Sequence, residues 1–287
     1  MERTYSYNPN LPSIALGGGG TFGMGVEAGY LDEFKDRGAD FSNAQIIGTS
    51  AGSWVGGFVA TGKTFEEITS KVKKIKVPNH QPGYLRDIAR EIFGDERASN
   101  VSGMAVRWPS RRGELPRMEA LNGSEHDLAD IVAASSSVPG LFPKHMIDGK
   151  LYYDGGIRSM ASANLAPKSH KLLAIAALGG NLGEDINLQV GRFNIAPGPL
   201  GRVAGFALEK WFEIEMGQWK RRHGGELIFI RPNREINSLV RTPMDCFSVE
   251  VGKRAYELSR AHAAQLIDRR ESIFNLVDEV RHIDPAA

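Results

Sequence analysis

The segment that decides the fold is Ile14–Trp54, IALGGGGTFGMGVEAGYLDEFKDRGADFSNAQIIGTSAGSW. Its short apolar run Ile14–Leu16 breaks into four glycines at 17–20, a pattern that predicts a buried strand followed by a glycine loop. A helical pattern then runs to Gly38, and a second apolar strand at 44–47 leads into a sharp turn. The segment therefore predicts a strand, a helix and a second strand, which together form one βαβ unit.

The turn after the second strand, Gly48-Thr49-Ser50-Ala51-Gly52, has the Gly-x-Ser-x-Gly spacing of a nucleophile elbow. Such a turn holds its serine hydroxyl exposed at the start of a helix, and its glycines let two stretches of backbone pack closely. A βαβ connection makes the two strands parallel, so the glycine loop and Ser50 emerge at the same carboxyl edge of the sheet. The N–H groups of that loop are then suited to form an oxyanion hole for a carbonyl attacked by Ser50.

The glycine loop also fits another motif, because Gly18-x-Gly20-x-x-Gly23 matches the fingerprint of dinucleotide-binding domains. That site needs an acidic residue at the end of the second strand to bind the ribose. Here the second strand ends in Ile46-Ile47-Gly48, and Asp40 lies before it. The context therefore disfavours a dinucleotide site.

A phosphate-binding loop pattern occurs at residues 57–64, GFVATGKT. Such a loop must connect a strand to a helix that begins with the Lys and Thr. Trp54–Thr61 is better explained as the continuation of the helix that begins after Ser50, with Gly62 as its C-cap. The nucleotide interpretation is again disfavoured by its context.

The composition is that of a globular protein, with 41% hydrophobic and 24% charged residues in a chain of 287. A single α/β domain, residues 1–287, can reach this length when helices cover both faces of its sheet. The net charge of +1 predicts no nucleic-acid partner, and a single cysteine, Cys246, excludes an internal disulfide framework. No apolar run has the length of a signal peptide or a membrane span, so we expect a cytoplasmic protein. Nothing in the sequence predicts a cofactor or a metal site.

Local signals predict further elements before residue 120. Helices are expected at Thr64–Lys76 and Tyr84–Phe93, the first with a capping box at its start. Residues 100–118 are expected to form a hairpin around the turn Pro109–Gly113. The arginines of this turn could meet lipid headgroups, but solvent-exposed loop charge is the simpler interpretation.

An aspartate at the end of a later hairpin is the second candidate for chemistry. A helix is expected at Leu128–Ser137, and Ile147–Tyr153 predicts two short strands with Asp148-Gly149 at the turn. The second strand ends in Asp154-Gly155-Gly156. An aspartate placed in this way can reach a neighbouring loop, although Asp-Gly-Gly alone is more typical of a turn.

Toward the C-terminus the sequence predicts core strands at Lys171–Leu178 and Glu226–Ile230 and a final amphipathic helix at Ser248–Asp268. A helix between the two strands has a broad apolar face. That face comprises Val203, Ala207, Trp211 and Ile214 and is widened by Leu208, Phe212 and Met216. We interpret it as packing on the sheet rather than as a transient contact with a membrane surface, although such a stripe suits either.

Three of these motifs carry a family resemblance. Gly18–Gly23, Gly48–Gly52 and Asp154–Gly156, in this order, resemble the three motifs of patatin-like phospholipases. Ala134–Pro143 is similar to the segment that leads to the third motif in that family. The resemblance covers roughly Ile14–Pro167 and implies a three-layer α/β/α fold around a mostly parallel central sheet.

The resemblance also implies a role for each motif. Ser50 would be the nucleophile and Asp154 its partner in a two-residue dyad. The oxyanion loop would comprise Gly18, Gly19 and Gly20, and the supporting glycines would be Gly23, Gly48, Gly52, Gly155 and Gly156. The expected activity is that of a serine acyl hydrolase on a lipid or another acyl ester, with an acyl-enzyme intermediate that water clears.

Two alternatives stay open from the sequence. One is an α/β-hydrolase triad in the order Ser, Asp, His, although in this chain the glycine loop lies only one βαβ unit before the serine. The other is a patatin-like scaffold that binds acyl lipids without turning them over. This second alternative arises because Phe22 stands where the family usually has Arg or Lys, a position that bears on phosphate or headgroup recognition.

Overall fold

The structure is a computed structural model that describes residues 2–3, 11–72, 75–111, 113–178, 188–190, 193–195 and 199–269. At its centre is an eight-stranded sheet with the strand order β12-β9-β2-β3-β5-β8-β7, and β6 pairs with β5 off this path. Its strands are β2 (Ser13–Leu16), β3 (Gln45–Thr49), β5 (Val101–Arg107), β6 (Arg117–Asn122), β7 (His145–Ile147), β8 (Lys150–Asp154), β9 (Lys171–Ile175) and β12 (Glu226–Ile230). Two small sheets pair β1 (Glu2–Arg3) with β4 (Arg97–Ala98) and β10 (Leu188–Val190) with β11 (Phe193–Ile195).

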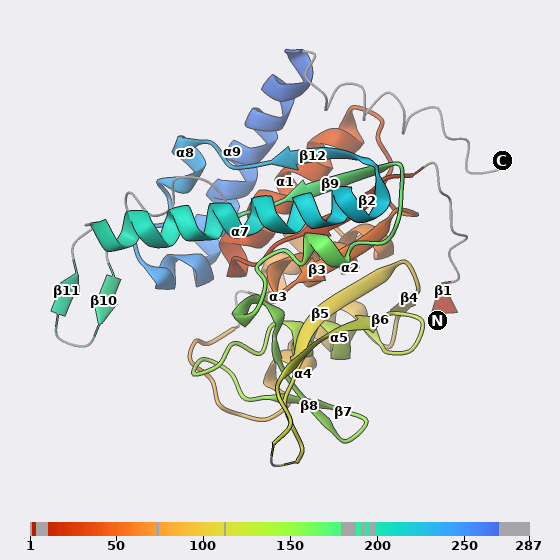
Figure 1. The fold of residues 1–287 in the computed structure, drawn as a ribbon, viewed down its shortest axis with the longest axis vertical. Helices are drawn as coiled ribbons and strands as arrows, with labels where there is room; N and C mark the ends of the chain where they lie inside the picture. The colour runs from red at the N-terminus through yellow and green to blue at the C-terminus, as the bar shows by residue number, and fades with distance from the viewer. Residues whose placement is uncertain are drawn as a thin grey trace.

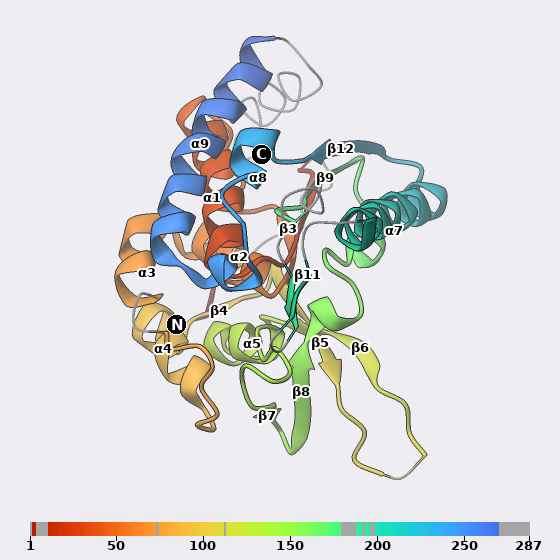
Figure 2. The same ribbon diagram turned by 90° about the vertical axis from the view of Figure 1, so that its left-hand side faces the viewer.

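Helices cover the sheet on both sides, as Figures 1 and 2 show. One layer contains α1 (Gly20–Asp36), α2 (Ala51–Thr61), α3 (Phe65–Val72), α4 (Tyr84–Phe93), α5 (Leu128–Ser135) and α9 (Val249–Asp268). The long helix α7 (Pro199–His223) lies alone on the other side in Figure 2. Short helical turns are η1 (Gly155–Ile157), η2 (Ala163–Leu165), α8 (Arg234–Asn237) and η3 (Pro243–Phe247). The expected three-layer α/β/α fold is confirmed.

The period of two along each strand explains how these layers form. Ile14 and Leu16 of β2 belong to the core under α1 and α2, whereas Ala15 between them belongs to the core under α7. Every residue of β2 and β9 is buried, which is typical of parallel strands covered on both faces. β12, β9, β2, β3 and β5 are mutually parallel, so their carboxyl ends share one edge.

Several local predictions are confirmed, with shifted boundaries. The helix after Ser50 ends at Thr61 with Gly62 as a left-handed C-cap, so Gly57 lies inside a helix and the phosphate-loop interpretation is wrong. The hairpin turn Asp148-Gly149 has φ values of 49° and 74°, as a two-residue hairpin turn requires. The second strand of the hairpin expected at residues 100–118 begins at Arg117 rather than directly after Gly113, because Pro116 has no N–H to donate to the ladder.

The apolar face of α7 differs from the prediction. Phe212, Met216 and Trp219 are buried against the sheet, whereas Trp211 and Ile214 are half-exposed. The core-packing prediction is therefore wrong for these two residues. Successive helical residues are about 100° apart, so Trp211 and Ile214 lie far from the stripe that Phe212 centres. Val203, Ala207 and Leu208 lie outside the described side chains.

Helix α1 carries an unusual buried group. It packs along α9 through glycines, since a Cβ on Gly25 or Gly29 would collide with backbone of α9. On another face of α1 the carboxyl group of Glu27 is completely buried, and neither of its oxygens has a hydrogen-bond partner that meets normal geometry. Burial raises the pKa of Glu27 well above its ordinary value, against a smaller opposing contribution from the Gly17 backbone. Glu27 therefore keeps its proton to a higher pH than an exposed glutamate does.

Candidate active site

The turn at Ser50 has the backbone geometry of a nucleophile elbow. β3 ends at Thr49, α2 begins at Ala51, and Ser50 between them has φ 51° and ψ −115°. Positive φ is strained for a residue with a side chain and marks a position that the surrounding fold holds in place. A Cβ on Gly48 would collide with the Gly52 carbonyl, so this motif position requires glycine.

Asp154 reaches the same place from the opposite direction. Along β5, Met104 pairs with Thr49 of β3, and the next residue, Ala105, pairs with Asp154 of β8. β3 runs parallel to β5 and β8 runs antiparallel to it, so the two strands meet end to end beside these consecutive residues. The register of β5 thus brings Ser50 and Asp154 together from positions 104 residues apart in the sequence.

The Asp154 carboxylate is buried, with 3% of the residue exposed, and its Oδ1 accepts a hydrogen bond from the Gly156 N–H at 2.6 Å. Burial raises the pKa of Asp154 to about 6, and the nearby Ser50 hydroxyl and the Gly156 N–H limit that rise. A carboxylate poised near neutral pH beside a serine hydroxyl can accept that proton.

The glycine loop presents its amides unequally. The Gly17 N–H donates to the Ile175 carbonyl, and the Gly18 N–H donates to the Met160 carbonyl at 2.7 Å. These bonds hold the loop in place, and the second disfavours Gly18 as an oxyanion donor. Gly19 and Gly20 have φ values of 151° and 58° and lead directly into α1, whose first N–H groups have no partner within the helix. Amides at a helix N-terminus favour a negative ligand.

Ser135 supports this site, although no motif in the sequence points to it. Ser135, at the end of α5, accepts a hydrogen bond from the Ser50 N–H at 2.9 Å and donates to the Met104 carbonyl at 2.7 Å. This buried hydroxyl therefore ties the elbow to the β5 residue that pairs with Thr49. The signal was the serine run 135–137 within the segment before the third motif, but a hydroxyl's partners cannot be read from the sequence.

The structure explains why Phe22 stands where patatin-like phospholipases usually have Arg or Lys. Phe22 lies in the first turn of α1 and is completely buried in the core shared with α2 and α9. A charged side chain at this position would lose its hydration without a partner, which costs several kcal/mol. In this chain the position serves packing rather than headgroup recognition.

The pocket that contains Ser50 is narrow, with a volume of about 40 Å³. Its walls include Met24, Trp54, Leu85, Phe142 and Phe247. Ligand pockets usually measure roughly 300 to 1,000 Å³. The pocket thus has an apolar lining suited to the reacting end of an acyl chain, but not the room for a whole lipid.

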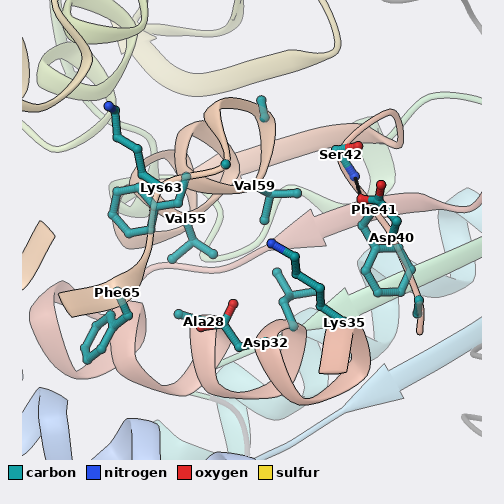
Figure 3. A pocket seen from close by; sticks show the side chains of 15 residues that line it. Ala28, Asp32, Lys35, Asp40, Phe41, Ser42, Val55, Val59, Lys63 and Phe65 are labelled. Carbon is teal, nitrogen blue, oxygen red and sulfur yellow. Dashed lines mark hydrogen bonds between the residues drawn. The ribbon is translucent and has the colours of Figure 1, made fainter. Parts of the chain in front are cut away.

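A wider pocket of about 210 Å³ lies at the other end of α1 and α2. Figure 3 shows Ala28 of α1 and Val55 and Val59 of α2 lining it, with Lys35 reaching over it. It lies beside the carboxyl ends of these two helices, whereas Ser50 and Gly20 lie at their amino ends. We place the candidate active site in the narrower pocket, because Ser50 and Gly20 line that pocket and do not line the wider one.

Two histidines, His145 and His262, bond to groups other than Ser50 and Asp154. His145 bonds to the Asp130 carboxylate at 2.8 Å, and His262 bonds to the Tyr30 hydroxyl at 2.6 Å. The groups that influence the Asp154 carboxylate are Ser50 and Gly156, with no histidine among them.

Within the described ranges no three His, Cys, Asp or Glu side chains cluster as metal ligands would. No described helix combines the length and the apolar character needed to cross a bilayer.

Comparison with known proteins agrees with these motifs. The family model for patatin-like phospholipases matches residues 14–167, more than half of the chain. Uncharacterized NTE family proteins of Mycobacterium bovis and of two Mycobacterium tuberculosis strains are 27% identical over 158 residues. That match covers 50% of this chain and 42% of each relative, so the chain spans less than half the length of these curated relatives. The chain belongs to the patatin-like phospholipase family.

Proposed function

We propose that this protein is a serine acyl hydrolase that cleaves lipid esters with a Ser50–Asp154 dyad. The observation that carries this proposal is the placement of the Ser50 hydroxyl, by the register of β5, next to a buried carboxylate whose pKa is about 6. The strained elbow, the amides at the start of α1 and the family membership support it. The proposed substrate is a lipid or another acyl ester, with no cofactor.

The reaction begins when Ser50 Oγ attacks the ester carbonyl while its proton passes to Asp154. The carbonyl oxygen becomes negative and is stabilised by the N–H groups of Gly19 and Gly20. As the tetrahedral intermediate collapses, the C–O bond to the alcohol breaks and the alcohol takes the proton from Asp154. Water then attacks the acyl-enzyme, Asp154 takes its proton, and Ser50 regains that proton as the carboxylic acid leaves.

Burial of Asp154 makes its carboxylate a better base for these reaction steps. At its ordinary pKa of 3.8 an aspartate is a weak base, and a rise to about 6 narrows the gap to the serine hydroxyl. Asp154 is still mostly ionised at pH 7, so the base is present in its active form. The Gly156 N–H also fixes Oδ1, which orients the carboxylate toward Ser50.

The rival triad gains no support from the partners of Asp154, because His145 and His262 are bonded elsewhere. The silent scaffold rested on Phe22, whose burial leaves the free amides of the loop untouched. We therefore favour a turnover enzyme that also touches a lipid surface transiently.

The test is labelling with a fluorophosphonate probe, which reacts with activated serines. We expect labelling at Ser50 alone, and none in Ser50→Ala, which should fold normally because alanine retains the backbone contacts of the elbow. Hydrolysis of short p-nitrophenyl esters should vanish in parallel. Labelling that survives Ser50→Ala would contradict the serine assignment. A folded His145→Ala or His262→Ala variant as inactive as Ser50→Ala would instead favour a triad.

A further inference from the structure

Four large apolar side chains are exposed on the two hairpins beyond the active site. Leu115 is 78% exposed, Met146 63%, and Trp108 and Leu151 38% each. Leu115 lies in the β5–β6 loop, Trp108 directly follows β5, Met146 lies in β7 and Leu151 in β8. We call these four residues, with the cations Arg111, Arg117, Lys144 and Lys150, the tip surface.

The sheet register makes most of the tip surface continuous. Met146 pairs with Leu151 across β7 and β8, so their side chains lie on the same face. The Trp108 N–H donates to the Leu151 carbonyl at 2.7 Å. The Trp108 ring meets the Tyr153 ring edge to face at 5.4 Å, and Lys144 Nζ lies 4.8 Å from the Trp108 ring centre. Trp108, Met146, Leu151 and Lys144 therefore share one patch. Lys150 and Arg117 lie on the other face of the hairpin ends, in register with Tyr152 rather than with Leu151.

Cations outnumber exposed acids at the ends of the hairpins. The four cations are spread over the two faces and the β5–β6 loop, and none of them forms an ion pair with a described carboxylate. The exposed acids on the same hairpins are Glu114 and Asp148, and the Glu119 carboxylate is already bonded by Arg107 and Tyr152. Lys and Arg are attracted to an anionic lipid surface. Aromatic rings beside such cations are typical of membrane interfaces.

The tip surface lies at the edge of the sheet where the active site opens. β5 continues for three residues, Ala105–Arg107, past its last pair with β3, which is about 10 Å beyond Thr49. Figures 1 and 2 show these hairpins projecting from the body of the molecule, with no helix over the face that α7 covers elsewhere. A surface that meets the hairpin tips therefore also approaches the edge that holds Ser50.

The size of the site adds a second argument. A pocket of about 40 Å³ admits only the ester region of a lipid, so most of each acyl chain must stay outside during reaction. A lipid that remains partly within its bilayer meets this requirement without exposing its chains to water.

We propose that the tip surface docks this protein on an anionic lipid bilayer. Leu115, Met146, Trp108 and Leu151 enter the interface, and the four cations contact the headgroups. The use of this docking for catalysis rests on the proposed function, whereas the docking itself can be measured without turnover.

The experiment is flotation of the full chain with vesicles of phosphatidylcholine alone or with 30% phosphatidylglycerol. We expect stronger binding to the anionic vesicles, and at least a tenfold loss for the double variant Leu115→Ser with Met146→Ser. Both positions are so exposed that the fold should survive, which circular dichroism checks. Trp211→Ser, an exposed aromatic on α7, is the matched control and should bind as the unchanged protein does.

Kinetics separate docking from chemistry. The double variant should hydrolyse a soluble short-chain p-nitrophenyl ester at the unchanged rate but lose at least tenfold in release of fatty acid from vesicles. Ser50→Ala should bind vesicles normally, so loss of the proposed function leaves the binding result intact.

Binding that is unchanged in the double variant, or lost equally in Trp211→Ser, would overturn the tip surface. Binding equal on neutral and anionic vesicles would overturn the role of its cations. Absence of binding to both would overturn membrane docking and leave the patch for a protein partner.

Discussion

The two halves of the central sheet differ in direction and in covering. β12, β9, β2 and β3 run parallel, and the residues of β2 and β9 are buried throughout. On the other side of β3, strands β6, β7 and β8 run antiparallel to their neighbours and expose one face. Parallel strands need both faces covered, whereas antiparallel strands tolerate one wet face. The first half therefore provides a rigid scaffold, and the second is free to carry an outer surface.

The candidate site lies where these halves join. The parallel half contributes Ser50 and the glycine loop from neighbouring strands, and the reversed strand β8 contributes Asp154. β5 belongs to both halves, since it pairs with β3 through Met104 and with β8 from Ala105 onward. If the dyad is right, damage to the contribution of either half should abolish turnover while the other half stays folded.

The strongest way to break this junction is Asp154→Asn. The amide keeps the shape of the side chain but cannot accept the serine proton, so we expect a loss of turnover on the order of a thousandfold. Turnover of a soluble ester is the measurement, and a normal circular dichroism spectrum shows that β8 still pairs with β5. A loss of less than tenfold in a folded variant would mean that the base lies elsewhere.

The contribution of the parallel half is tested by Gly19→Ala. A Cβ at Gly19 would lie 2.9 Å from the Gly23 Cα, and alanine disfavours its φ of 151°. Displacement of one oxyanion donor costs on the order of 3 kcal/mol, or about a hundredfold in turnover.

The matched variant is Gly18→Ala. Its Cβ would meet the flexible end of Met160, and the Gly18 N–H is already bonded to the Met160 carbonyl. We expect a loss of only a few fold in this variant. Equal losses of turnover in the two variants would contradict the prediction that the Gly19 N–H, and not the Gly18 N–H, donates to the oxyanion.

The smallest expected effect is the dependence of turnover on pH, which tests the contribution of β8 through Asp154. Asp154 must be ionised to act as a base, and its pKa is raised to about 6. We therefore expect kcat/KM for a soluble ester to be level above pH 7 and to fall about tenfold per pH unit well below pH 6. The residual activity of Asp154→Asn should lack this limb. A level profile between pH 7 and pH 5 in the unchanged protein would contradict the assignment of Asp154.

The sequence predicted the parallel half best. The βαβ pattern of Ile14–Trp54 implies its layers, the shared edge and the turn at Ser50 from local signals alone. Asp154 was a candidate from its place at the end of a strand, but only the family motif assigned it to Ser50, because the pairing of β8 with β5 depends on register between distant segments. The cytoplasmic location and the single domain of residues 1–287 stay predictions.

The sequence does not predict the contacts or the burial of side chains whose surroundings are set by tertiary packing. Ser135 bridges the Ser50 N–H and the Met104 carbonyl, and these two contacts come from separate elements. Trp211 belongs to an apolar stripe that looks wider in sequence than the sheet it covers, so it is left half-exposed. Periodicity identifies an apolar face, but the extent of the partner surface decides which residues are buried.

The buried carboxyl groups set stability and activity against each other. Burial raises the pKa of Asp154 from 3.8 to about 6 and that of Glu27 well above 4.5, so above pH 4 these two groups hold more protons in the folded chain than in the unfolded chain. Unfolding then releases protons, and the free energy of unfolding contributed by these groups falls as the pH rises through that window. Burial of Asp32 and Glu215 acts in the same direction. The stability that these buried acids contribute is thus largest on the acidic side of pH 6, where the proposed base, Asp154, is protonated and turnover should be lowest.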